Sequence, residues 1–334
     1  MTSIPIRAAA SVWLIVTVLA AAGAPSPAAA QDGSVSTGSE GALFLLLPVG
    51  ARAVALGRVM TTVESSEAAF WNPAGLAGVD KNEIVLFRGD HVAGTATALT
   101  GVWGSSDAGS LGLSYFLLDA GELDQRDENG NYTGTITIRN HLGVASAATR
   151  LFDGMSAGVS FKVVQFRLSC RGICPDAGTA ATTWAVDAGV QARPIERLRV
   201  GAMVAHLGPR LQVRNAEQAD PLPTRIRVAA SYDILRALTE REEVSGWLGI
   251  EVQDRLRDPG SLSVYFGTEL SAGTDDVISL RAGYVVADLD QEDGTRVGLG
   301  VRYERFELSI AKSLAVSTLT GETEPVHVTF AIGL

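Results

Sequence analysis

Apolar and polar residues alternate along most of the chain from Asn82 to the C-terminus. In the final segment one set of alternate positions is apolar and the other is small or polar: Val326, Val328, Phe330, Ile332 and Leu334 against His327, Thr329, Ala331 and Gly333. Side chains of a β-strand point alternately to its two faces, so this pattern predicts a strand with one apolar face. The same alternation recurs in residues 159–163, 225–232, 296–304 and 305–310.

About fourteen strand-length runs follow one another between turn signals. They begin near Glu83, Gly94, Ser110, Thr135, Met155, Ala181, Arg197, Thr224, Val244, Ser261, Val277, Thr295, Arg305 and Val326. Short connections alternate with longer polar ones, as periplasmic turns alternate with extracellular loops in outer-membrane barrels. The link 235–243 is long for such a turn, and it has room for a helical turn.

Charged residues recur on the face of the strands opposite the apolar one. The set comprises Arg225, Arg227, Arg281, Arg296, Arg302, Glu304, Arg305 and Glu307. A soluble sandwich or propeller, the alternative fold, would bury this face, whereas a barrel lumen tolerates charges that pair with each other or with water. We therefore predict an all-β fold, a transmembrane antiparallel β-barrel of about fourteen strands. The charges are interpreted as pairs that brace the wall; a polar path along the lumen is the alternative.

Residues 41–80 do not alternate, and they precede the barrel assigned to residues 81–334. Residues 66–71 favour a helix, and Pro73 fits the first position of another because its ring fixes φ and removes a donor. A segment of this size is too short to fold alone. We predict that it lies in the barrel as a hatch with short helices.

Two parts of this segment carry a resemblance to a known family. Residues 44–57 read FLLLPVGARAVALG, and residues 67–77 read EAAFWNPAGLA. They resemble the N-terminal signature of PorV/PorQ-type outer-membrane proteins, which are similar in turn to FadL-type long-chain fatty acid transporters. The resemblance implies a fourteen-stranded barrel closed by an N-terminal hatch. Its motif residues here are Gly50, Ala51, Arg52, Asn72, Pro73, Ala74 and Gly75.

The first thirty residues have the pattern of an export signal. Arg7 precedes an apolar run of about fifteen residues, and Ala28, Ala29 and Ala30 precede Gln31. This run is shorter than the roughly 20 residues of a membrane-spanning helix. We predict a signal peptide over 1–30 and a flexible mature N-terminus over 31–40, with an uncleaved anchor as the alternative. The expected location is the outer membrane of a Gram-negative-type bacterium, with its lipid as a partner.

Composition excludes several classes of function. With 27 Lys and Arg against 37 Asp and Glu, the net charge of −10 argues against nucleic-acid binding. The four histidines are scattered, and neither a His-Glu-x-x-His nor a Gly-x-Ser-x-Gly motif occurs, so we expect no enzyme, no cofactor and no catalytic residue.

Cysteine and acidic residues give weak signals. Cys170 and Cys174 lie in a loop-like stretch, where export would allow a local disulfide; a zinc site would need further ligands. Two acidic stretches, around Asp127 and over residues 288–294, miss the calcium-loop consensus. We interpret both as solvated turns and predict no metal site.

Two functions from different classes remain. PorV/PorQ-type members are partners of exported proteins in type IX secretion, which implies protein binding with exported proteins or other secretion components. A FadL-type passive transporter, the alternative, would take hydrophobic small molecules such as long-chain fatty acids through an apolar pocket lined by Phe44, Phe70 and Trp71. Because the signature is closer to PorV/PorQ and the long loops are acidic or mixed, the sequence favours the secretion partner.

Overall fold

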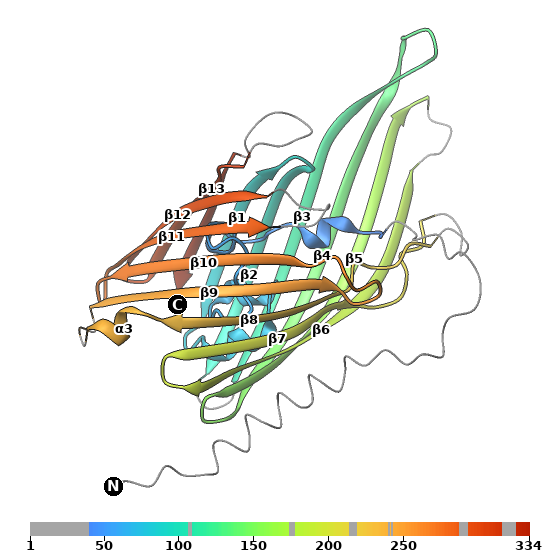
Figure 1. Cartoon of the computed structure of the whole chain (residues 1–334). Helices are drawn as coiled ribbons and strands as arrows, with labels where there is room; N and C mark the ends of the chain where they lie inside the picture. Colours follow the sequence, from blue (N-terminus) through green and yellow to red (C-terminus); the bar gives the residue numbers. More distant parts are fainter. Residues whose placement is uncertain are drawn as a thin grey trace, which may run out of the picture. The chain divides into compact units, whose positions relative to one another are not determined.

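A computed structural model describes residues 40–334 except 106–108, 174–177, 214–218, 240, 242, 287–292 and 316–324. Within these residues, fourteen antiparallel strands form a closed barrel (Figure 1). Each strand pairs with its neighbours in sequence, and β14 closes the barrel by pairing with β1, Glu83 opposite Gly333. The predicted signal peptide lies outside the described residues.

The strands begin close to the positions that the alternation predicts. They are β1 (Glu83–His91), β2 (Gly94–Ser105), β3 (Gly109–Arg126), β4 (Tyr132–Phe152), β5 (Met155–Gly172), β6 (Thr179–Ile195), β7 (Leu198–Leu207), β8 (Arg225–Asp233), β9 (Val244–Arg255), β10 (Ser263–Ala272), β11 (Val277–Val286), β12 (Gly294–Tyr303), β13 (Phe306–Ser313) and β14 (Val326–Gly333). The prediction of an all-β barrel of about fourteen strands is confirmed, and the sandwich and the propeller are excluded.

The two faces of the wall differ as the alternation requires. On β11, Leu280 points outward and is 59% exposed, while its neighbours Ser279 and Arg281 point inward and are buried. Leu280 pairs laterally with Leu270 of β10 and Leu299 of β12, so apolar side chains form a continuous outer surface. A wall of this kind suits contact with lipid, because the closed sheet has no unpaired edge strand.

The two ends of the barrel differ in their connections. At one end, called here the turn end, short turns join β4 to β5 and β6 to β7, and α3 (Leu235–Leu238) lies in the link where a helical turn was predicted. The other end, called the loop end, carries longer connections such as 208–224.

The 21 residues of β4 span roughly 70 Å at about 3.4 Å per residue. This exceeds the apolar band of about 25 Å that a barrel presents to lipid, so β4 extends beyond it.

The described residues before β1, from residue 40 onward, form four short helices inside the barrel, visible in blue within the ring of strands in Figure 1. They are η1 (Leu43–Leu46), α2 (Ala51–Ala55), η2 (Ser66–Ala69) and η3 (Pro73–Gly78). No helix among the described residues has the length and apolar character needed to cross a membrane.

This inner segment runs the length of the lumen. The Gly41 N–H donates to the Pro221 carbonyl at the loop end, whereas Asn82 accepts a bond from the Leu334 N–H at the turn end. The chain therefore enters the lumen at one end and leaves it at the other before β1 begins. We call residues 40–80 the hatch.

Leu280→Arg is expected to destabilise the barrel by about 2–4 kcal/mol, because it places a charge in the middle of the outer apolar surface. Denaturant unfolding of the protein in lipid vesicles measures this cost. Leu238→Arg is the matched control on exposed α3, and its effect should stay within about 0.5 kcal/mol. Equal losses in the two variants would contradict a lipid-facing outer wall.

Candidate functional site

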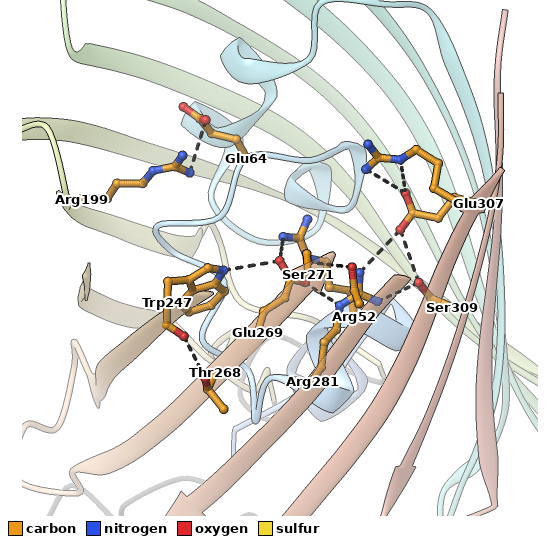
Figure 2. A network of polar contacts seen from close by, with 12 residues as sticks. Arg52, Glu64, Arg199, Trp247, Thr268, Glu269, Ser271, Arg281, Glu307 and Ser309 are labelled. Carbon is orange, nitrogen blue, oxygen red and sulfur yellow. Dashed lines mark hydrogen bonds and ion pairs between the residues drawn. The ribbon is translucent and has the colours of Figure 1, made fainter. Parts of the chain in front are cut away.

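The Gly-Ala-Arg motif attaches the hatch to two strands of the wall. The Ala51 N–H donates to Thr329 Oγ1 of β14 over 2.8 Å. The Arg52 guanidinium donates to both carboxylate oxygens of Glu269 on β10, at 2.7 and 3.0 Å (Figure 2). A bidentate pair of this kind fixes position and direction together. Residues Ala51 and Arg52 therefore hold α2 in place against the lumen wall.

Gly50 is required by its backbone and by its surroundings. Its φ of 104° belongs to a region that side chains disfavour, and a Cβ here would lie 2.3 Å from the carboxyl carbon of Glu67. Thr329 Oγ1 donates to this carboxyl group as well. Burial raises the pKa of Glu67 to about 7, against the lowering effect of Arg281 and Arg52. Packing of the Glu67 carboxyl against Gly50 thus joins η2 to the start of α2.

Glu269 is the centre of a larger network in the lumen. It also receives bonds from Arg281 Nε of β11 at 2.5 Å and Trp247 Nε1 of β9 at 3.4 Å. Arg281 continues to Ser309 at 2.8 Å and to Glu307 at 3.6 Å (Figure 2). One carboxylate thus connects the hatch to three neighbouring strands.

The predicted set of inward charges is correct in part. Arg281 and Glu307 pair across strands, and Arg225 binds Glu40 of the hatch at 2.6 and 2.7 Å. Glu304 and Arg305, however, are exposed in the turn between β12 and β13, so their assignment to the lumen was wrong. The sequence places a strand boundary near Arg305, but the alternation was extended through this tight turn and assigned both residues to the inward face.

The second motif begins at Asn72, which binds both the hatch and the wall. Its Oδ1 accepts from the Ala74 N–H and caps η3, with Pro73 at the first helical position. Its Nδ2 donates to the carbonyls of Thr61 and Val190. A Cβ on Gly75 would lie 2.4 Å from the Val63 carbonyl oxygen, so the turn admits only glycine there.

A further anchor was not predicted from the sequence. Glu251 of β9 is fully buried, and its Oε2 accepts from the N–H groups of Met60 and Thr61, each at 2.9 Å. It satisfies two backbone donors of the hatch that would otherwise be buried without partners. An isolated acid at an inward position, between Ile250 and Val252, was the available signal.

Phe44, Phe70 and Trp71, the predicted ligand-lining residues, line one cavity of about 20 Å³ together with wall residues. Phe44 stacks on Phe116 of β3 with centroids 6.3 Å apart and planes 3° apart, and Phe70 meets the same ring edge-on at 6.4 Å. Trp71 donates from Nε1 to the Val49 carbonyl at 2.9 Å. Aromatic groups of the hatch and the wall thus meet in the lumen.

The same cavity has a polar side formed by the wall. Lys162 of β5 and His206 of β7 line it, and both are almost fully buried. Lys162 pairs with Asp187 of β6 at 2.5 Å, and Asp187 also accepts from the His206 N–H at 2.8 Å. His206 has a φ of 60°, beside a register shift between β6 and β7. Asp187 thus stabilises a bulge in the wall next to the cavity.

Contacts divide the hatch into two parts. Residues 50–79 bind directly to several strands through the anchors described above. Between Ala42 and Val49, by contrast, no hydrogen bond joins the hatch to a wall strand among the described residues; Leu46 and Val49 accept bonds only from hatch residues Arg58 and Trp71. We call residues 40–49 the cover segment. It is held by the contacts of Glu40 and Gly41 with the barrel, by these two bonds within the hatch and by apolar packing.

A second cavity, of about 530 Å³, opens at the turn end. Its lining is charged and includes two carboxylates of the hatch. Glu64 pairs with Arg193 at 2.5 Å and with Arg199 at 3.4 Å, and Asp80 pairs with Arg150 at 2.9 Å. This cavity is polar and partly exposed, and it differs in chemistry from the aromatic one.

The remaining predicted residues lie away from these cavities. Cys170 is near the end of β5, but Cys174 lies outside the described residues, so their disulfide stays a prediction. Asp127 accepts bonds from Asn129 and Asn131 in its own loop, and hydrogen bonding from Asn131 holds the pKa of Asp127 below its usual range. Residues 287–292 of the other acidic stretch are not described. No group of three or more potential metal ligands forms in the described part of the chain.

Glu269→Gln is expected to lower the free energy of unfolding by about 3 kcal/mol or more, because it leaves Arg52 and Arg281 in the lumen without their counter-charge. Asp119→Asn is the matched control, since Asp119 pairs with Arg139 at an exposed site; its cost should not exceed about 1 kcal/mol. Denaturant unfolding followed by heat-modifiable gel migration measures both. Equal costs would show that Glu269 does not anchor the hatch.

Comparison with solved structures gives the same fold in hydrocarbon channels. The toluene transporter TbuX of Ralstonia pickettii matches with a TM-score of 0.58 and 13% identity, over 85% of this chain and 97% of that one. The monoaromatic hydrocarbon channel CymD matches with a TM-score of 0.58 and 11% identity, over 89% and 99%. A FadL homologue of Pseudomonas aeruginosa matches with a TM-score of 0.51 and 10% identity, over 86% and 98%.

No protein-family model matches the sequence, and neither does any curated protein. At 10–13% identity the likeness to solved structures is one of fold. The matches confirm the barrel fold that the FadL-like part of the predicted resemblance implies, and they give no support to its PorV/PorQ part. The chain has the fold of the FadL-like outer-membrane channels.

Proposed function

We propose that this protein is an outer-membrane channel for the passive uptake of hydrophobic small molecules. The observation that carries the proposal is the aromatic cavity inside the closed barrel, where Phe44, Phe70 and Trp71 of the hatch meet Phe116 of the wall. Apolar pockets with a few polar groups are the usual form of small-molecule sites. The sequence favoured a secretion partner, and this proposal reverses that order.

The comparisons supply the second line of support. The similar structures include a toluene transporter and a monoaromatic hydrocarbon channel. We extend that class of ligand to this chain because its own residues form an aromatic cavity in the lumen. The reading as a partner of exported proteins or secretion components has no such support.

Passage requires the hatch to move, since a cavity of about 20 Å³ holds no more than about one water molecule. The cover segment, residues 40–49, is the part that yields in this proposal. Its apolar side chains face the cavity, and a hydrophobic ligand can replace their contacts at small cost in free energy. Displacing the cover segment breaks one wall ion pair, that of Glu40 with Arg225, whereas displacing residues 50–79 would break several buried anchors, among them Arg52 with Glu269.

The proposal includes the location and division of the chain. Residues 1–30 are the signal peptide, 31–40 the mature N-terminus, whose last residue Glu40 belongs to the hatch as named above, 41–80 the rest of the hatch and 81–334 the barrel. The loop end faces the exterior and the turn end faces the periplasm, because short turns lie on the periplasmic side of outer-membrane barrels. An oxidising exterior suits a disulfide between Cys170 and Cys174.

Phe70→Ala is expected to weaken toluene binding roughly tenfold or more, because the variant loses the edge contact with Phe116 and the apolar area of one ring. Isothermal titration of the detergent-purified protein measures the affinity. Phe266→Ala, a matched change on the outer face of β10, should leave the affinity unchanged. Wild-type protein that binds no hydrophobic ligand, or equal losses in the two variants, would refute the proposal.

A further inference from the structure

Two arginines stand side by side on the outer face of the barrel, toward the loop end. Arg139 of β4 and Arg167 of β5 are direct partners in the register of the two strands, and both are exposed. Their chain neighbours Asn140 and Phe166 point into the lumen, so the two arginines point outward. Like charges directly opposite each other on one face of a sheet repel, and this pair therefore destabilises the sheet unless an anion lies against it.

One acid of the protein reaches this pair. Asp119 of β3 binds Arg139 Nε at 2.9 Å. On its other side Arg167 faces the small residue Ala180 of β6, and it forms no ion pair with any residue that the structure describes. Arg167 therefore keeps its charge and its hydrogen-bond donors for a partner outside the chain.

The outward positions of β5 place these arginines relative to the lipid. From the turn end they read Ala157, Val159, Phe161, Val163, Gln165 and Arg167. At about 3.4 Å per residue and a strand tilt of about 40°, Gln165 lies roughly 26 Å along the membrane normal from Met155, the first residue of β5. This distance matches the apolar band of about 25 Å, so Arg167 stands about 5 Å beyond the band. A headgroup layer is roughly 5–8 Å deep, and Arg167 lies within it.

Aromatic residues mark the same boundary independently. Trp184 of β6 is half-exposed on the outer face and stacks on Phe161. Tyr115 of β3 is half-exposed as well, and its hydroxyl group is hydrogen-bonded to His141 Nδ1 over 2.7 Å. Tyrosine and tryptophan gather at the interfaces of membrane barrels. His141 is the register partner of Gln165, so the arginine pair lies at the next outward position beyond this interface.

From this placement we infer that Arg139 and Arg167 bind the phosphate group of a lipid in the leaflet at the loop end, which the proposed location makes the outer leaflet. Guanidinium groups bind phosphate through parallel N–H bonds, and a phosphate between the two arginines offsets their repulsion. The further acids of this region, Glu122 and Asp124, lie on β3, and β4 separates them from Arg167. The inference goes beyond the channel function and uses no part of the lumen.

A lipid fits this site better than a free phosphate ion does. Ion pairs with exposed arginines are weak and are screened by salt. The acyl chains of a lipid, however, would lie against Val163 and Phe161, directly below the arginines on the same face of β5. Burial of the chains holds the phosphate at the level of Arg167, so both parts of the lipid have a partner on one strand.

Dioleoyl phosphatidic acid and dioleoylglycerol form a matched pair of probes, since they share both acyl chains and differ in one phosphate group. Native mass spectrometry of the detergent-purified protein measures the apparent affinity for the first lipid bound. The wild-type protein should bind phosphatidic acid at least about tenfold more tightly than dioleoylglycerol. Arg167→Gln and Arg139→Gln should each weaken the binding of phosphatidic acid about fivefold or more and leave that of dioleoylglycerol unchanged.

Two exposed arginines away from the pair serve as matched controls. Arg171 lies on the same face of β5, about 10 Å further from the apolar band along the membrane normal. Arg236 lies on α3 at the turn end. Arg171→Gln and Arg236→Gln each remove one charge, and each should change the affinity for phosphatidic acid by less than about twofold. Heat-modifiable gel migration shows that the variants fold.

Several results would overturn the lipid site. They are equal binding of the two lipids by the wild type, an unchanged affinity in folded Arg167→Gln, and equal losses in Arg167→Gln and Arg171→Gln. Displacement of phosphatidic acid by an equal concentration of inorganic phosphate would overturn the assignment to a lipid. Toluene binding separates this inference from the channel proposal, since Arg167→Gln should bind toluene as the wild type does.

Discussion

The need to fill a wide lumen determines most of this structure. Closing the sheet gives the backbone groups of the two edge strands their hydrogen-bond partners, as contact with lipid demands. Fourteen strands, however, enclose more space than the side chains of the wall can occupy. The hatch fills that space, and it brings its own backbone donors and charged groups into the interior. Glu269 and Glu251 meet this demand, one by holding Arg52 and the other by receiving the N–H groups of Met60 and Thr61. Without such wall carboxylates, the hatch would bury unpaired polar groups.

The same requirement explains why the two parts of the hatch differ. In residues 50–79, Arg52 and the backbone N–H groups of Ala51, Met60 and Thr61 each have a polar partner on the wall, and these bonds fix the position of this part. The cover segment places mainly apolar side chains against apolar wall residues, and such contacts have little directional preference. A hydrophobic ligand can therefore make contacts with the wall of similar free energy to those of the cover segment. The part of the hatch that covers the aromatic cavity is thus also the part that is easiest to displace.

Alternation along the strands was enough to predict the barrel. Residues such as Leu280 and Phe330 point to lipid while Ser279 and Thr329 point inward, and a period of two determines this without any knowledge of neighbours. Phe44, Phe70 and Trp71 were predicted to share a pocket, and the structure places them around one cavity. The helical turn at 235–238 followed from the length of its link.

The anchors were harder to predict, because a single inward acid looks the same whether it meets water or a hatch. Glu251 has apolar neighbours in sequence, and nothing local shows that Met60 and Thr61 lie opposite it. The path of the hatch from the loop end to the turn end depends on contacts of Gly41 with a loop about 180 residues away. Pairings over such separations leave no pattern in one sequence.

Stapling the cover segment tests the account most directly. A Cβ on Gly41 would lie 3.7 Å from the Leu211 Cβ, within the usual span of a disulfide of about 3.5–4.5 Å, and 2.8 Å from the Asp220 Cβ, so both forms of the variant also carry Asp220→Gly to make room. The Gly41→Cys, Leu211→Cys variant, with Cys170 and Cys174 replaced by serine, would be compared oxidised and reduced for toluene uptake into vesicles. The account predicts that the oxidised form blocks uptake and that a reductant restores it. Equal uptake by the fully cross-linked and reduced forms would contradict the claim that the cover segment must move.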